Sequence, residues 1–97
     1  MITLAEINQH MEKLKDWDMD VNTLVKTFHF ENSKASIDFV NKIMEIADEM
    51  NHHPDIFISY NIVKLSLITH SENSLSSADF KLAEAIDKIT PENTETP

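Results

Sequence analysis

Three of the five histidines in this chain of 97 residues stand where they could transfer protons. His52 and His53 precede Pro54, and His70 ends a run of strand-forming residues. An imidazole carries protons near neutral pH because its ordinary pKa of about 6.5 lets it both donate and accept. The three residues therefore indicate a general acid/base site. On spacing alone, a structural loop that ends a helix explains the His-His-Pro sequence equally well.

Two other chemistries fit these histidines less well. A metal site could combine His52, His70 and a carboxylate, but their spacing matches no standard zinc pattern. A Ser-His-Asp hydrolase needs a sharp turn around its nucleophile, and this chain has no glycine with which to build one. We expect neither a metal nor a cofactor, and the metal site remains the open alternative.

The composition of the chain excludes further classes of function. The absence of cysteine excludes disulfides and thiolate nucleophiles, and the absence of glycine removes the loops that hold nucleotide phosphates. The chain carries 17 acidic and 8 basic residues, a balance that opposes nucleic-acid binding. Its apolar runs are too short to cross a bilayer, and its first residues show no basic region followed by an apolar run, so we expect no secretory leader. We expect a cytoplasmic protein that binds neither nucleic acid nor membrane.

Three segments with helical periodicity would position the histidines. Their predicted ranges and caps are 3–15 with Thr3 and Glu6 as a capping box, 33–51 with Asn32 or Ser33 as the cap, and 76–90 with Ser76 and Asp79 as a second capping box. The last helix should end at Thr90-Pro91. We expect residues 1–90 to form a single domain and residues 91–97 to form a flexible C-terminal tail.

Two other segments are typical of β-strands. Residues 23–30 are rich in β-branched and aromatic side chains and follow a turn-rich stretch, which predicts a hairpin. The run 56–68 is strand-like except at Tyr60-Asn61, which predicts two strands joined by a tight turn or bulge. The element order αββαββα predicts an α+β fold with two layers, in which a four-stranded antiparallel sheet packs three helices on one face.

The second predicted helix has more apolar surface than one sheet face needs to cover it. Its apolar residues, which fill about half of the helix circumference, are Ile37, Phe39, Val40, Ile43, Met44, Ile46, Ala47 and Met50. The surplus indicates a subunit interface. The alternative is that Phe39 and Ile46 lie under loops of the same chain.

The spacing of the polar residues resembles the signature of the pterin-4a-carbinolamine dehydratase family. The matching residues are Asp48, His52-His53-Pro54, Tyr60, His70 and Asp79, together with Trp17, Phe28-His29-Phe30, Phe39, Asn61, Thr69 and Leu82-Ala83. They cover nearly the whole chain apart from its tail. Asp16 and Asn73-Ser74 stand where family members often have glycine, and Asn and Asp tolerate a left-handed backbone better than other residues do.

The resemblance implies that the chain dehydrates a 4a-hydroxytetrahydropterin to a quinonoid dihydropterin, in the tetrahydrobiopterin recycling that serves aromatic amino acid hydroxylases. Loss of water requires one proton for the departing hydroxyl and removal of another from nitrogen. His52 and His70 are the implied acid and base, and His53 is a third catalytic candidate that binds and orients the pterin. We expect Asp48 to orient His52 and Asp79 to orient His70.

The resemblance also implies contacts and partners. The implied substrate contacts are made by backbone groups of Asn51, His52, His53, Ile68, Thr69, His70 and Ser71. A pterin substrate, a homodimer or homotetramer, and a functional link to phenylalanine hydroxylase are implied as well. The alternative function is a non-enzymatic one, because animal members of the family also act as coactivators that bind a homeodomain transcription factor.

Overall fold

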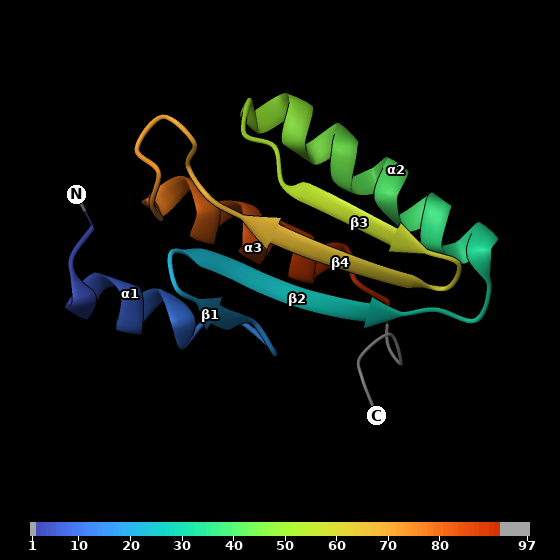
Figure 1. The fold of residues 1–97 in the computed structure, drawn as a ribbon, viewed down its shortest axis with the longest axis horizontal. Coiled ribbons are helices and arrows are strands. Elements are labelled where there is room, and N and C mark those ends of the chain that lie inside the picture. The colour runs from blue at the N-terminus through green and yellow to red at the C-terminus, as the bar shows by residue number, and fades with distance from the viewer. Residues whose placement is uncertain (1, 92–97) are drawn as a thin grey trace.

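The computed structural model of this chain describes residues 2–91 and has the predicted order αββαββα (Figure 1). The elements are α1 (Leu4–Met11), β1 (Asp18–Asp20), β2 (Thr23–His29), α2 (Ser33–Met50), β3 (Asp55–Ser59), β4 (Ile62–Leu67) and α3 (Ser77–Ile89). The four strands form one antiparallel sheet in the order β1-β2-β4-β3. The predicted α+β fold is therefore confirmed. The predicted tail lies outside the described residues except for Pro91.

The core forms between the sheet and its helices. Every second side chain of β2 and β4 is buried, as expected for strands that cover a core on one face only. The fully buried apolar side chains of the sheet and of α2 and α3 are Leu24, Phe28, Val63, Leu65, Leu67, Ile43, Ala47, Phe80, Leu82, Ala83 and Ile86. α1 lies against α3, where the ring of His10 stacks on Phe80 with 4.8 Å between the ring centroids.

The first helix is shorter than predicted and ends at Met11 rather than near residue 15. The backbone of Lys15 is held by tertiary contacts instead. Its carbonyl accepts a hydrogen bond from Lys26 Nζ at 2.7 Å, and its N–H donates to Asp87 Oδ2 at 3.2 Å. The same carboxylate accepts from Trp17 Nε1 at 2.8 Å. These contacts fasten the segment after α1 to β2 and to the end of α3.

Phe39 belongs to the core of the single chain. Its ring lies 4.9 Å from that of Phe28 and 5.0 Å from that of Phe30, measured between centroids, and only 3% of the residue is exposed. The expectation that Phe39 contributes to a subunit interface is therefore wrong, because Phe28 of β2 and Phe30, which follows β2, complete the core around it. Ile46 is half-buried, whereas Ile37 is exposed.

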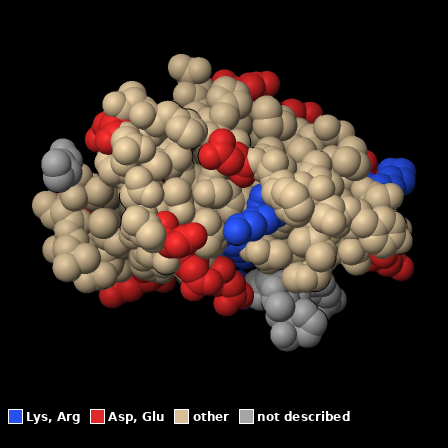
Figure 2. All heavy atoms as spheres, in the orientation of Figure 1, with Lys and Arg blue, Asp and Glu red and all other residues tan. Residues whose placement is uncertain are grey.

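Within residues 2–91, no helix covers the opposite face of the sheet. α3 runs behind the sheet in Figure 1, and the space-filling view of the same orientation shows acidic groups scattered over the surface with basic atoms near its middle (Figures 1 and 2). No helix of the described chain, residues 2–91, is long and apolar enough to span a bilayer.

In the described part of the chain, five residues take the left-handed backbone that glycine would otherwise supply. Their φ angles are 60° at Asp16, 58° at Val21, 51° at Asn51, 52° at Tyr60 and 51° at Asn73. Asn and Asp occupy three of these positions, in line with their tolerance of this region. A β-branched valine tolerates it poorly, so Val21 is a strained position in the turn between β1 and β2.

Candidate active site

The predicted histidines gather at one end of the sheet. Here α2 ends, β3 begins, β4 ends and α3 begins (Figure 1). Hydrogen bonds connect these elements, because Asp79 of α3 contacts both His52, which follows α2, and Thr69, which follows β4. Side chains far apart in the sequence thus meet in one place.

The end of α2 sets the direction of the two adjacent histidines. Asn51 adopts a left-handed conformation, and the N–H of His52 then donates to the carbonyl of Ala47 at 3.1 Å. This pattern satisfies the last carbonyls of the helix and turns the chain sharply. The following Pro54 is buried. The His52 side chain turns inward and is 16% exposed, whereas the His53 side chain turns outward and is 46% exposed.

His52 is held by a fully buried carboxylate. Its Nε2 lies 2.6 Å from Oδ1 of Asp79. The other oxygen, Oδ2, accepts hydrogen bonds from Thr69 Oγ1 at 2.8 Å and from the backbone N–H of Ser76 at 3.0 Å. The Ser76 N–H bond is half of the capping box that begins α3. One carboxylate therefore caps a helix and orients an imidazole.

The donors in this network assign the tautomer of His52. Oδ2 of Asp79 already accepts two hydrogen bonds, and with Oδ1 also as an acceptor the hydrogen bond to His52 uses the N–H at Nε2 of the imidazole. The remaining nitrogen, Nδ1, has no hydrogen-bond partner among residues 2–91. Nδ1 is therefore the nitrogen of His52 that is open to a ligand, while Asp79 holds the orientation of the ring.

His53 and His70 each lie near a carboxylate that is more exposed. Nε2 of His53 is 2.7 Å from Oδ1 of Asp48, and Nε2 of His70 is 3.7 Å from Oδ1 of Asp55. The His70 side chain is 71% exposed, and its distance to Asp55 is that of an ion pair without a direct hydrogen bond. These imidazoles are therefore more accessible to solvent than His52 is.

The loop after β4 presents the backbone next to His70. The N–H of Thr69 donates to the carbonyl of Ser74 at 3.0 Å, and the N–H of Asn73 donates to the carbonyl of His70 at 3.2 Å. The left-handed Asn73 completes this turn without glycine. Its carbonyl accepts from Asn22 Nδ2 at 3.0 Å, which fastens the loop to the turn between β1 and β2.

The structure pairs the predicted residues differently from the sequence-based expectation. Asp48 contacts His53 rather than His52, because α2 ends at Met50 and the turn after it breaks the helical spacing between residues 48 and 52. Asp79 contacts His52 rather than His70, because Asp79 is fully buried at the start of α3, whereas the His70 side chain is exposed.

Asp55 is a residue of this site that the sequence patterns did not indicate. Its position immediately after His-His-Pro, where β3 begins, is the signal that could have identified it.

The predicted substrate contacts lie in the two segments that meet at this site. Asn51, His52 and His53 follow α2, and Ile68, Thr69, His70 and Ser71 follow β4. Ile68 is buried and Thr69 donates its hydroxyl to Asp79, so these two residues can offer only backbone groups to a ligand. Among the described residues, 2–91, no three His, Asp or Glu side chains form a group that could hold a metal ion.

Comparison with known proteins relates this site to one family. The profile of the family described as Pterin 4 alpha carbinolamine dehydratase matches residues 1–89. A protein of Sulfolobus acidocaldarius, provisionally named pterin-4-alpha-carbinolamine dehydratase, is 48% identical over 84 residues, which cover 87% of this chain and 92% of that protein. A protein of Chloroflexus aurantiacus with the same provisional name is 44% identical over 88% of this chain and 91% of its own length.

Two solved structures share the fold. The transcriptional coactivator/pterin dehydratase of Brucella melitensis superimposes with a TM-score of 0.86 at 29% identity, covering 93% of this chain and 98% of that one. A pterin dehydratase-like protein described as a RuBisCO assembly factor in the alpha-carboxysome superimposes with a TM-score of 0.62 at 19% identity, covering 81% and 90% of the two chains. The second likeness concerns the fold alone.

Proposed function

This chain belongs to the pterin-4a-carbinolamine dehydratase family, and on that premise we propose that it removes water from a 4a-hydroxytetrahydropterin to form a quinonoid dihydropterin. The observation that carries the proposal is the set of three imidazoles at one end of the sheet, each with its Nε2 directed at a carboxylate. Such groups can deliver and remove protons at neutral pH. The reaction requires both transfers.

The two proton transfers suit different histidines. The bond from C4a to its hydroxyl breaks as a proton joins the departing oxygen, and a ring nitrogen loses its proton as the carbon–nitrogen double bond forms. We assign the removal of the nitrogen proton to Nδ1 of His52, because Asp79 would stabilise the resulting cation. We assign delivery of the proton to His70, whose exposure allows it to be reprotonated from water. One proton enters and one leaves, so the catalyst is regenerated.

His53 and the neighbouring backbone complete the proposed site. Because His53 points away from His52 and is half-exposed, it suits the binding and orientation of the pterin at the rim of the site. The backbone of residues 51–53 and 68–71 would contact the pyrimidine part of the ring, which needs both donors and acceptors. The proposed place of the reaction is tetrahydrobiopterin recycling, downstream of a hydroxylase of phenylalanine or another aromatic amino acid.

The direct test is a stopped assay with synthetic 4a-hydroxytetrahydropterin, in which formation of quinonoid dihydropterin is followed. We expect His52→Ala and His70→Ala each to lower kcat by roughly 10²-fold to 10⁴-fold. His29→Ala serves as a matched control, because His29 ends β2 at the opposite end of the sheet. Wild-type activity in both site variants would exclude the acid/base assignment.

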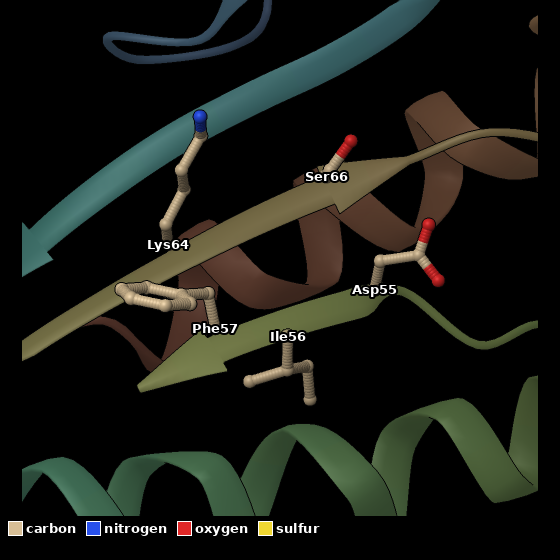
Figure 3. Close-up of a pocket in the computed structure, with 5 residues that line it drawn as sticks. All are labelled: Asp55, Ile56, Phe57, Lys64 and Ser66. Carbon is tan, nitrogen blue, oxygen red and sulfur yellow. The ribbon is translucent and has the colours of Figure 1, made fainter. Parts of the chain in front are cut away.

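Self-association is a further part of the proposal. β3 is an edge strand, and α2 runs beside it (Figures 1 and 3). Large apolar side chains are exposed along this side, with exposed fractions of 46% at Ile37, 39% at Ile58 and 67% at Tyr60. An edge strand next to apolar side chains favours pairing with a second chain. Sedimentation should show a dimer or tetramer, and Ile58→Lys should shift it toward monomer.

The exposed apolar side chains along α2 and β3 also support the alternative function, in which the chain binds a different protein as a coactivator. The Brucella melitensis protein of the same fold is described by both roles, as a transcriptional coactivator and as a pterin dehydratase. The two functions differ in their dependence on histidine. Dehydration requires His52 and His70, whereas binding of a partner through α2 and β3 does not.

A further inference from the structure

A hollow on the uncovered face of the sheet adjoins the histidine site, and apart from Asp55 its lining residues have no part in the mechanism described above. Its volume is about 430 Å³, and its lining residues are Asp55, Ile56, Phe57, Lys64 and Ser66 (Figure 3). The sheet register pairs Asp55 with Ser66 and Phe57 with Lys64. The hollow is therefore built on two cross-strand pairs of β3 and β4.

The hollow and the histidine site share one residue. Asp55 lines the hollow, and its Oδ1 lies 3.7 Å from Nε2 of His70. Alternate residues on one face of a strand are about 6.6 Å apart, so Phe57 is the next residue after Asp55 on this face of β3. A ring bound at His70 would thus have the hollow as its neighbour, within the length of a short substituent.

Lys64 supplies the hollow with an available positive charge. It is exposed, and it forms no ion pair or hydrogen bond with any of the described residues. The other strand lysine, Lys26, is buried on the opposite face of the sheet. In Figure 3 the Lys64 side chain rises from β4 with its ammonium toward β2, and the ring of Phe57 lies beside its base. In a chain of net charge −9, a cation without a partner beside the proposed catalytic site is suited to an anionic ligand.

Phe57 and Ser66 supply the other two kinds of contact. The ring of Phe57 is 61% exposed and offers an apolar surface on which a carbon chain can pack. Ser66 is half-buried and can donate a hydrogen bond from its hydroxyl. Apolar surface with a few polar groups at fixed positions is typical of small-molecule subsites.

We propose that this hollow is a subsite for the substituent of the pterin ring, and that Lys64 selects substituents that end in an acidic group. The inference rests on the proposed function of the histidine site. The carbon chain of the substituent packs on Phe57, and its terminal phosphate or carboxylate lies at the ammonium of Lys64. Pterins with an acidic side chain should therefore be better substrates than neutral pterins, among them the tetrahydrobiopterin intermediate of the recycling proposed above.

The test compares kcat/KM for three 4a-hydroxytetrahydropterins, whose side chains are a methyl group, a chain ending in a carboxylate and a chain ending in a phosphate. We expect the wild type to prefer an acidic substrate to the methyl one by about threefold to fivefold, the effect of one partly exposed ion pair. Lys64→Met should remove most of this preference, and Lys64→Arg should retain it. High salt should weaken it in the wild type.

The controls separate the subsite from a general charge effect and from failure of the proposed function. Lys42→Met removes an exposed lysine from α2 and should keep the wild-type preference. A wild type without preference, or a Lys64→Met variant that slows all three substrates equally, would overturn the subsite. If no pterin is turned over, the proposed function fails. In that case, calorimetric titration with oxidised pterins that carry a methyl or a phosphate side chain tests the subsite by binding alone. Tighter binding of the phosphate pterin would support the subsite, and equal binding of the two would overturn it.

Discussion

Oδ1 of Asp79 lies 2.6 Å from Nε2 of His52, although the two residues are 27 positions apart in the chain. Asp79 is fully buried and caps α3 through its other oxygen. The relationship joins the start of a helix to the imidazole for which we propose the removal of a proton. It also makes Asp79 the residue at which stability and activity can be tested together.

Asp79→Asn should impair both properties. An amide can place a donor where His52 now finds an acceptor, which favours the wrong tautomer of the imidazole. We expect kcat to fall by roughly 10-fold to 100-fold and the free energy of unfolding to fall by about 1–3 kcal/mol. Dehydratase kinetics and urea denaturation measure the two effects, and ¹⁵N shifts of His52 report the tautomer.

The matched variant is Asp48→Asn, which alters the carboxylate beside His53. The Asp48 side chain is 71% exposed, so its interaction with His53 is screened by water. The free energy of unfolding should change by less than about 0.5 kcal/mol, and kcat should fall less than in Asp79→Asn. A larger loss of kcat in Asp48→Asn than in Asp79→Asn would mean that the contact of Asp48 with His53 matters more for the reaction than that of Asp79 with His52.

The buried ion pair at the far end of α3 should matter for stability alone. Lys26 Nζ lies 3.1 Å from Asp87 Oδ1, and the Lys26 side chain is 2% exposed. Asp87→Ala leaves that ammonium without its carboxylate and also removes the acceptor of the Trp17 indole. We expect a loss of about 3 kcal/mol in urea denaturation.

Lys26→Met should cost less than Asp87→Ala, because methionine fills a similar volume and Asp87 keeps its bonds from Trp17 and Lys15. A larger loss of stability in Lys26→Met than in Asp87→Ala would show that the hydrogen bond from the Lys26 ammonium to the Lys15 carbonyl contributes more than the bonds of Asp87. Neither variant should alter the pH profile of kcat, since the pair lies at the other end of α3 from Asp79.

Val21→Gly should stabilise the chain. Val21 has φ of 58° and is 92% exposed, so the substitution relieves backbone strain without removing a buried side chain. The left-handed conformation costs a residue with a β-carbon about 1–2 kcal/mol, and the greater freedom of glycine in the unfolded state offsets part of this gain. We expect a rise in Tm of about 2–6 °C. A lower Tm would mean that the valine side chain contributes packing that outweighs the strain.

The capping box of α1 should respond to acid. The hydrogen bond from the Thr3 hydroxyl to Glu6 lowers the pKa of the Glu6 carboxyl, and a second bond from the Thr3 backbone N–H acts in the same direction. A pKa lowered by folding adds stability above the ordinary glutamate pKa, and this stability is lost as the pH falls through the lowered value. In an NMR titration, Thr3→Ala should move the Glu6 midpoint upward, and Thr3→Ser should leave it low.

The pattern of local signals was sufficient to predict the elements and their order. Both capping boxes are present, at Thr3 with Glu6 and at Ser76 with Asp79, because such motifs act within one turn. The predicted end of α1, near residue 15, was wrong because of contacts beyond the local sequence. Lys15 lies in a helical pattern, but its backbone bonds to Lys26 and Asp87, which are distant in sequence, and such tertiary contacts override local propensity.

The site could be predicted by residue but not by pairing. His52, His53 and His70 could be selected from their type and position, whereas the partner of each imidazole depends on the direction of the chain at Asn51. A helical continuation would place Asp48 beside His52, and the left-handed turn places Asp48 beside His53 instead. Single dihedral angles of this kind are not determined by periodicity.

The dual use of Asp79 would tie the proposed catalysis to local unfolding. Each opening of the first turn of α3 releases the Ser76 N–H from the carboxylate and also frees the His52 imidazole. Amide hydrogen exchange at this turn would then measure the fraction of molecules whose base is unsupported. A substitution that slows this exchange, without touching the pterin, should raise the population of competent enzyme at high temperature.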